Sequence, residues 1–336
     1  MYQYQPQQAP IPPKKKKWPI VLAITIPSVL VIAVVVLLIS GIVNAAKNFA
    51  PGNSGGNLGA LPGTPYVGIL HIEGTIIKDS ADGYDHEWAL AEVKRLRDDD
   101  SNLALLLSID SPGGAIYETD ELYLAIEDYK QVTGRPVFAW GGSLMASGGY
   151  YLAVTAEDIT VNRNCWTGSI GVNGGTVIDI SEFLEKNNIH VANVTAGENK
   201  AMGGLFGEFT DEQKAIYQSL VDESYSQFVS VVAEGRSMNA NDVTALADGR
   251  IYSANQALSN GLVDGIGSLD DAEARLEEKL GYVPEYIDLE NKTSYGFLDY
   301  FLALPQGKTA LSDLRTAIEL KDSVSAEPSY LCELFK

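Results

Sequence analysis

The chain has 336 residues, enough for one large domain or two ordinary ones. Its 44 acidic and 24 basic side chains give a net charge of −20, which argues against a nucleic-acid-binding protein because such proteins need a basic surface. Two cysteines, Cys165 and Cys332, can form at most one bridge and so exclude a disulfide scaffold, and three histidines leave little room for a His-rich metal site or a His-dependent triad.

The N-terminal part predicts a membrane anchor. Residues 18–46 carry no charge and are mostly apolar, and about 20 such residues in a helix span a bilayer. The run is far longer than the 7–15 or so apolar residues of a signal peptide, so we expect a retained transmembrane helix in contact with lipid. Four lysines precede it and only Lys47 follows it closely, which places the Gln/Pro-rich, disordered residues 1–17 in the cytoplasm and the rest outside.

The remainder of the chain is strongly acidic. Residues 1–47 hold five lysines and no acidic residue, so the part beyond them has a net charge of −25. Residues 47–63 are rich in Gly, Pro, Ser and Asn, a composition typical of a flexible linker. We expect this linker to separate the acidic domain from a membrane surface that is often anionic.

Residues 64–280 alternate short apolar runs with amphipathic stretches, which predicts an α/β domain with a largely parallel sheet. The longest expected helix begins after Thr210, where Gln213 completes a capping box, and Gly235 is expected to close it. The strands are expected at 67–72, 103–109, 136–140, 159–161 and 191–194, and the helices at 85–98, 122–129 and 211–233.

The C-terminal extension, residues 281–336, is less regular. Residues 297–304 and 311–320 could each form a helix. Residues 323–336 read as an extended tail that is either disordered or docked in a groove of its own or of a neighbouring subunit.

Three glycine-rich segments each follow an expected strand. Residues 110–114 could be an ordinary tight turn, or could present backbone N–H groups as an oxyanion hole. Residues 141–151 place Ser147 at an expected helix start, where its hydroxyl is either a cap or a nucleophile in the field of the helix N-terminus. Residues 167–172 form a structural turn or supply a second hydroxyl, Ser169, that touches the base.

A serine nucleophile needs a base. His71 and His190 fall in expected strands and His86 at a helix start, so each is interpreted as structural or surface-exposed. A neutral lysine could serve instead, although an ordinary lysine pKa of about 10.4 must first be lowered by burial. Lys200 is the best candidate because the segment around it, 196–204, has little other charge, whereas the other lysines considered lie on amphipathic helices.

These stretches together resemble the signal peptide peptidase A family, membrane-anchored Ser–Lys proteases with the Clp-protease/crotonase fold, a ββα superhelix with a mainly parallel sheet. The resemblance covers residues 64–275. The stretches that carry it are SPGG at 111–114, MASGGYYLA at 145–153, TGSIGV at 167–172, AGENKAM at 196–202 and ADGRIYSANQALSNGLVDGIGSLDDA at 247–272.

The resemblance implies a role for each site residue. Ser147 matches the nucleophile, Lys200 the general base and Ser169 the hydroxyl that orients the lysine. The backbone N–H groups of Gly114 and Gly148 match the oxyanion hole, and no metal or cofactor is implied. Asn199 stands where many relatives have an aromatic residue, a departure that bears on a pocket wall rather than on the dyad.

The resemblance also implies an assembly and a substrate class. We expect a ring-shaped homo-oligomer in which serine and lysine come from neighbouring subunits, acting on released signal peptides and other short or unfolded peptides at the outer face of the cytoplasmic membrane. Two alternatives stay open. A crotonase-type acyl-CoA enzyme shares the fold, and acyl-CoA binding would reveal it. A non-catalytic membrane scaffold would lack the intact Ser147/Lys200 pair.

Overall fold

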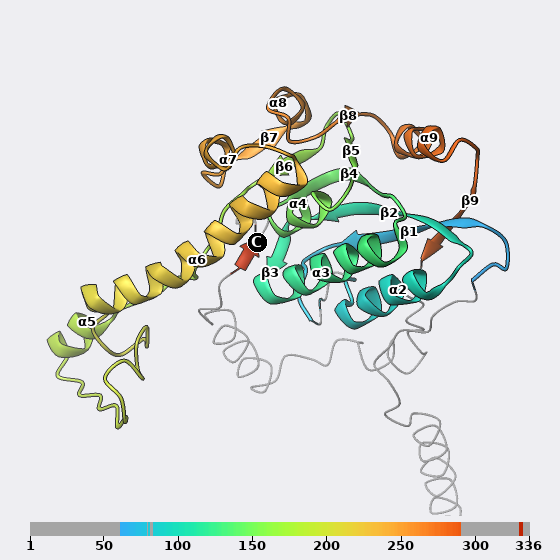
Figure 1. The fold of residues 1–336 in the computed structure, drawn as a ribbon. Helices are drawn as coiled ribbons and strands as arrows, with labels where there is room; N and C mark the ends of the chain where they lie inside the picture. Colours follow the sequence, from blue (N-terminus) through green and yellow to red (C-terminus); the bar gives the residue numbers. More distant parts are fainter. Residues whose placement is uncertain (1–60, 79, 81–82, 290–328, 332–336) are drawn as a thin grey trace, which may run out of the picture. The chain divides into compact units, whose positions relative to one another are not determined.

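The computed structural model describes residues 61–78, 80, 83–289 and 329–331 (Figure 1). The predicted membrane span over 18–46 and the predicted helices over 297–304 and 311–320 lie outside these residues. Within the described part of the chain, no helix is both long and apolar enough to cross a bilayer.

A mostly parallel sheet forms the centre of the domain, as the sequence predicts. Its main path runs in the order β7-β6-β4-β2-β1-β9, and β5 joins the path at β4 and pairs on its other side with β8. Every pairing in this sheet is parallel except that of β6 with β7. The strands are β1 (Tyr66–Glu73), β2 (Asn102–Ser111), β4 (Val137–Ala146), β5 (Asp158–Val161), β6 (Trp166–Gly168), β7 (Ile251–Ser253), β8 (Gly265–Ile266) and β9 (Glu285–Leu289).

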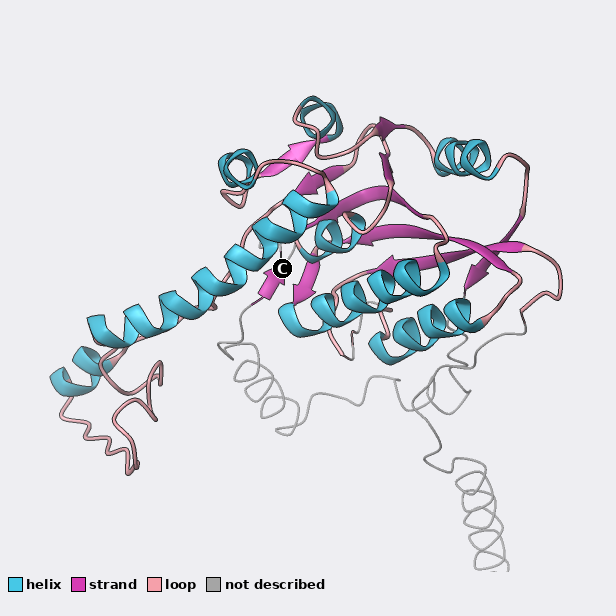
Figure 2. Ribbon diagram, viewed as in Figure 1, coloured by secondary structure: helices cyan, strands magenta, loops and turns pink. Residues whose placement is uncertain are grey.

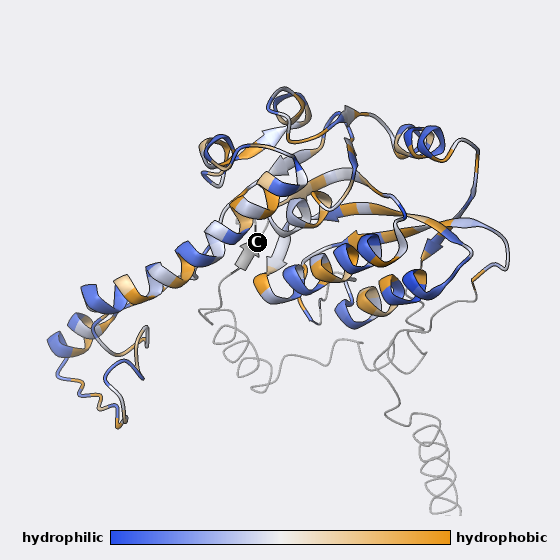
Figure 3. Cartoon of the chain, in the orientation of Figure 1, coloured by the Kyte–Doolittle hydropathy of each residue, from blue (hydrophilic) through white to orange (hydrophobic). Residues whose placement is uncertain are grey.

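Helices pack against both faces of the sheet (Figure 2). The helices are α2 (His86–Asp98), α3 (Ile116–Thr133), α4 (Gly148–Ala153), α5 (Ser181–Lys186), α6 (Asp211–Gly235), α7 (Ala240–Leu246), α8 (Ala254–Ser259) and α9 (Leu269–Leu280). Because side chains alternate along a strand, β2 feeds two cores: Leu105 and Leu107 join the core that includes α2, α3 and α4, and Leu106 joins a smaller one with Leu276 of α9. Buried on both faces, the central strands are accordingly hydrophobic (Figure 3).

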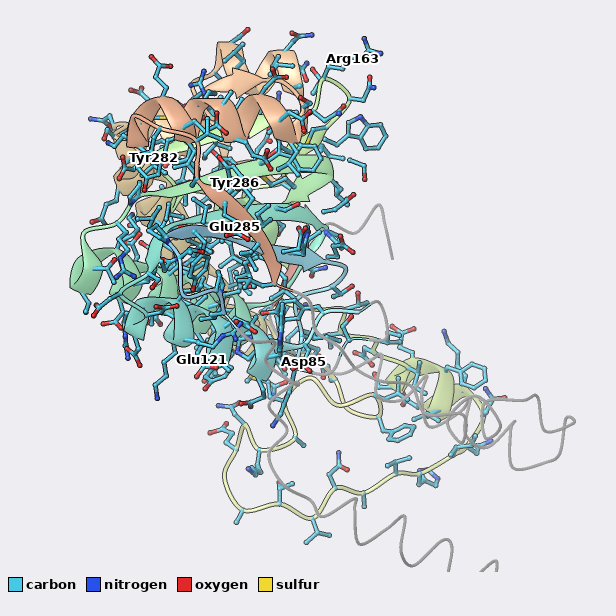
Figure 4. The ribbon with its side chains drawn as sticks, turned by 90° about the vertical axis from the view of Figure 1, so that its right-hand side faces the viewer. Asp85, Glu121, Arg163, Tyr282, Glu285 and Tyr286 are labelled. Atoms are coloured by element: carbon cyan, nitrogen blue, oxygen red, sulfur yellow. The ribbon has the colours of Figure 1, made fainter. Side chains whose placement is uncertain are left out.

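Local signals fix the ends of several helices. The Asp85 side chain accepts a hydrogen bond from the backbone N–H of Trp88 at the start of α2, and Gly134 ends α3 in the left-handed conformation with φ 66°. Figure 4 labels Asp85 beside α2 and Glu121 on α3, and the ring of His86 links these helices through a 2.8 Å contact with Glu121. At the far edge of the sheet, the Tyr286 hydroxyl of β9 donates to the carbonyl of Glu273 in α9, which ties that helix down.

One predicted strand is absent, and one predicted helix end has a different cap. Residues 191–194 form no strand: they follow α5 in a segment that packs on no sheet edge, and Val194 is 98% exposed. Two valines in a short stretch are therefore insufficient to make a strand without a neighbouring strand to pair with. α6 ends at Gly235 as predicted, but the C-cap is Arg236, and a Cβ on Gly235 would meet the carbonyl oxygen of Val154 at 2.2 Å. The glycine lets α6 pack closely on the chain just beyond α4.

A second, two-stranded sheet lies next to the glycine-rich turn after β2. Its strands are β3 (Gly113–Ala115) and β10 (Ser329–Leu331), which run antiparallel with Tyr330 opposite Gly114. The described part of the C-terminal tail is thus an extended strand seated on its own chain.

Candidate active site

Ser147 sits at the junction between β4 and α4. Its backbone has φ 53° and ψ −117°, a conformation that residues with a side chain rarely adopt. Its backbone N–H donates to the carbonyl of Gly168 over 2.7 Å, and the residue is 1% exposed. The predicted helix start is therefore present, but Ser147 makes no side-chain capping hydrogen bond, which leaves its hydroxyl available for chemistry.

Gly114 presents its backbone polar groups to the side of β3 that faces β10. On the opposite side, the carbonyl of Gly113 accepts from Ile76 N–H and Ala115 N–H donates to the Ile76 carbonyl, both over 2.9 Å. Because these groups alternate along a strand, the N–H and C=O of Gly114 point the other way. A Cβ at Gly114 would lie 1.9 Å from the Ile76 carbonyl oxygen, so this close approach requires glycine.

Gly148 brings the start of α4 against this strand. A Cβ on Gly148 would lie 3.1 Å from both the backbone nitrogen of Gly114 and the Cα of Gly113. The first N–H groups of a helix have no acceptor within the helix, and they carry its positive dipole end. Two backbone N–H donors from different elements thus lie beside Ser147, an arrangement that suits a developing oxyanion.

Ser169 lies beside the nucleophile candidate because β4 and β6 are parallel neighbours. Ala146 is in register with Gly168. The next residue along each strand, Ser147 and Ser169, therefore lies just beyond the two neighbouring strand ends. Ser169 is buried and also has a positive φ of 50°, and its backbone N–H donates to the carbonyl of Arg250. The structure therefore gathers four of the five predicted site residues: Ser147, Ser169, Gly114 and Gly148.

Lys200 is the fifth, and this chain does not bring it to Ser147. Its side chain is exposed and has no hydrogen-bond or ion-pair partner among the described residues. Its segment folds against the N-terminal half of α6, where Gly203 lies close to the ring of Tyr217, whereas Tyr151 of α4 contacts Phe228 with ring centroids 5.0 Å apart. Tyr217 and Phe228 are eleven residues apart on α6, which corresponds to about 16 Å along a helix.

In the described part of the chain, the side-chain contacts of the histidines are with residues other than Ser147. His71 Nε2 lies 2.7 Å from Asp288 Oδ1, and buried His86 lies between the Tyr84 hydroxyl and Glu121. His190 is exposed in the segment after α5. Their interpretation as structural or surface residues agrees with these contacts, although His190 does not begin a strand as expected.

A cysteine nucleophile is disfavoured. Burial raises the pKa of the Cys165 thiol to about 12, so the reactive thiolate is scarce at neutral pH. Cys332 lies outside the described residues.

Asp110 is a structural contributor that the sequence argument missed. Its carboxylate accepts from the Ser143 hydroxyl over 2.7 Å and from the backbone N–H of Leu144 over 3.1 Å. These bonds hold the part of β4 that leads into Ser147, at the point where β2 and β4 shift register. An acidic residue at the carboxyl end of a buried strand was the available signal, but its partners, more than 30 residues away, are not visible in the sequence.

Comparison with known proteins identifies the family. The family model described as peptidase family S49 matches residues 130–282. An Enterococcus faecium protein, provisionally named signal peptide peptidase SppA, is 36% identical over 238 residues, covering 70% of this chain and 68% of that protein. The chain belongs to peptidase family S49.

Relatives of this S49 peptidase support the same class of activity. Protease 4 of Haemophilus influenzae is 31% identical over 63% of this chain and 34% of its own length. The chloroplastic serine protease SPPA of Arabidopsis thaliana is 25% identical over 78% of this chain and 38% of its own length. Family membership and these relatives make the protein a serine protease.

Proposed function

We propose that this S49 peptidase cleaves peptides with a Ser147–Lys200 dyad, with Ser147 as the nucleophile. The observation that carries the proposal is the position of Ser147, beside the backbone N–H groups of Gly114 and Gly148 and next to a strand that already accepts an extended peptide segment. Serine, oxyanion donors and a peptide-binding strand edge together match acyl transfer at a peptide bond.

The proposed reaction proceeds in two acyl-transfer steps. Neutral Lys200 accepts the hydroxyl proton as Ser147 Oγ attacks the peptide carbonyl carbon, and the carbonyl oxygen becomes an oxyanion held by the N–H groups of Gly114 and Gly148. The C–N bond then breaks, and the protonated lysine gives its proton to the leaving amine. Water, deprotonated by the same lysine, attacks the acyl ester and releases the acid and the free Ser147 hydroxyl.

The substrate is proposed to bind as a strand on β3. β10 shows the geometry: three residues of the chain's own tail run antiparallel to Gly113–Ala115. Strand addition of this kind uses main-chain hydrogen bonds and therefore suits unfolded or short peptides rather than folded proteins. This preference is consistent with released signal peptides as the substrate class, at the outer face of a membrane to which residues 18–46 anchor the chain.

The base is proposed to come from a neighbouring copy of the chain. Lys200 is exposed, and its segment folds on the half of α6 that lies away from α4. The segment around it also exposes many apolar side chains, a common mark of a protein-binding surface. These residues are Ile178, Phe183, Ile189, Val191, Val194, Leu205 and Phe206. A ring-shaped homo-oligomer would cover them and complete each active site, with Ser169 placed to orient the incoming lysine.

Covalent labelling tests the proposal. A fluorophosphonate probe on the full-length chain should modify Ser147, as mapped by mass spectrometry, and both Ser147→Ala and Lys200→Ala should lose peptide cleavage while remaining folded. Lys186→Ala, on exposed α5, is the matched control and should keep activity. Probe attachment to another residue, or full activity in Lys200→Ala, would contradict the dyad. The alternatives predict different results: acyl-CoA binding for a crotonase-type enzyme, and no labelling for a scaffold.

A further inference from the structure

Thr119 is a buried polar residue that the proposed reaction does not yet use. It lies in the first turns of α3 and is 0% exposed, and its Oγ1 has no hydrogen-bond partner. Leaving a buried hydroxyl unpaired costs stability. Such a group needs an explanation.

The location of this hydroxyl supplies one. Thr119 Oγ1 lies 2.8 Å from the position that a Cβ on Gly148 would occupy, and the same position is 3.1 Å from the Gly114 nitrogen and the Gly113 Cα. α3, β3 and α4 therefore meet at one point. The two N–H groups proposed to hold the oxyanion flank that point.

The surroundings hold Thr119 in place. On the next residue, the Asp120 carboxylate accepts from the Tyr151 hydroxyl of α4 over 2.6 Å and from Gln227 of α6 over 2.9 Å. α3 and α4 are thus joined beside Thr119.

We propose that Thr119 is a positioning residue for the oxyanion hole. Its hydroxyl oxygen sets the spacing between the backbone N–H groups of Gly114 and Gly148. An oxygen suits this point because it is smaller than a methyl group, so it fits closer to the Gly148 backbone without a hydrogen bond. A methyl group in the same place pushes α4 away from β3 and misplaces one donor. The inference rests on the proposed Ser147 chemistry.

The test compares Thr119→Val and Thr119→Ser in the full-length chain. Thr119→Val should lower kcat about ten- to a hundredfold, the usual cost of a small misplacement in an active site, with little change in KM. It should weaken inhibition by a peptide aldehyde, which loads the oxyanion hole, by a similar factor. Thr119→Ser keeps the oxygen and should restore most of kcat and the aldehyde affinity.

Thr155→Val is the matched control. Thr155 is also a buried threonine, at the other end of α4, but its hydroxyl is paired with the Leu152 carbonyl over 2.7 Å. It should lower Tm and leave kcat unchanged, whereas Thr119→Val should lower kcat. Wild-type kcat in Thr119→Val, or a kcat loss that Thr119→Ser shares, would overturn the inference. The proposed function fails separately, if Ser147→Ala remains active.

Discussion

At the residue scale, two of the candidate site residues have a strained backbone. Ser147 and Ser169 both have positive φ, as do Asn188 and Ser237 elsewhere in the described chain. A residue with a side chain in this region costs about 1–3 kcal/mol, and such residues persist only where the surrounding structure holds them. At Ser147 the holding contacts are the Gly168 carbonyl on one side and α4 on the other, and the strained turn directs the chain so that β3 and α4 flank the serine.

Replacing Ser147 with glycine should therefore separate stability from activity. The free energy of unfolding of Ser147→Gly should be about 1 kcal/mol higher than that of Ser147→Ala, because only glycine relieves the positive φ. Both variants should be inactive. Urea titration and a peptide-cleavage assay measure the two effects. Ser237→Gly, at φ 52° away from the site, is the control and should gain stability with activity intact. Equal stability of the two Ser147 variants would show that the backbone is not strained there.

Much of the site could be predicted at this scale, and some of it could not. Ser147, Gly114 and Gly148 stand in short glycine-rich motifs after strands, where local chemistry limits the possible roles. Asp110 and Thr119 act through contacts with residues far along the chain, so nothing in their own neighbourhood of the sequence marks them.

At the element scale, one ion pair connects the end of α6 to the segment before β8. The two terminal guanidinium nitrogens of Arg236 donate to the two Asp264 carboxylate oxygens over 2.7 and 2.8 Å. Asp264 also accepts from the backbone N–H of Ile159. Burial acts to raise the pKa of Asp264, but the hydrogen bonds from Arg236 and Ile159 outweigh it, so the pKa is lowered. The pair fixes α6 against the sheet that carries Ser147.

Asp264→Asn should consequently destabilise the fold in a pH-dependent way. At pH 7 the loss should be about 2 kcal/mol, since charged hydrogen bonds are broken while Arg236 stays largely buried. Because the folded pKa lies below the unfolded value near 3.9, this contribution is present above about pH 4 and disappears as pH falls through the folded pKa. Urea unfolding at pH 7 and at pH 3 measures it. Glu223→Gln, an exposed change on α6, is the control and should alter the free energy of unfolding at neither pH. A loss of stability in Asp264→Asn that does not depend on pH would contradict the linkage.

The tail strand β10 should compete with substrate for β3. Deleting residues 329–336 should raise kcat/KM at least about twofold, mainly through a lower KM, because the strand edge is then free in every molecule. Peptide-cleavage kinetics measure the change. Deleting only 332–336 retains β10 and should leave the kinetics unchanged. Lower activity on removal of 329–336 would show instead that the strand supports the site.

Elements with strong local signals were predictable, and those that depend on partners were less so. The sequence pattern located β1, β2, α2 and α6 because each has a continuous apolar run or a capped amphipathic helix. The stretch 191–194 contains two valines but also Asn193, has no strand beside it and remains irregular. β3 and β10 are short and polar or glycine-rich, so only their pairing defines them as strands.

At the scale of the whole molecule, the proposed Ser147–Lys200 dyad requires a second copy of the chain. One chain brings together the proposed nucleophile and oxyanion donors but leaves Lys200 exposed on a segment with many exposed apolar side chains. The sequence motifs predict both residues of the proposed dyad, yet a motif carries no information about which copy of the chain supplies each residue. The sequence alone could therefore predict Ser147 and Lys200 as a pair. Only the arrangement of α4 and α6 shows that the two residues lie apart within one chain.

Co-expression of two inactive variants tests whether the dyad is shared between subunits. Ser147→Ala and Lys200→Ala are each expected to be inactive, but co-expressed in equal amounts they should regain about a quarter of wild-type activity, because a random cyclic assembly pairs an intact serine with an intact lysine at about one interface in four. The double variant mixed with Ser147→Ala is the control and should stay inactive. Recovery of activity is the predicted result; complete inactivity of co-assembled single variants would contradict a dyad shared between subunits.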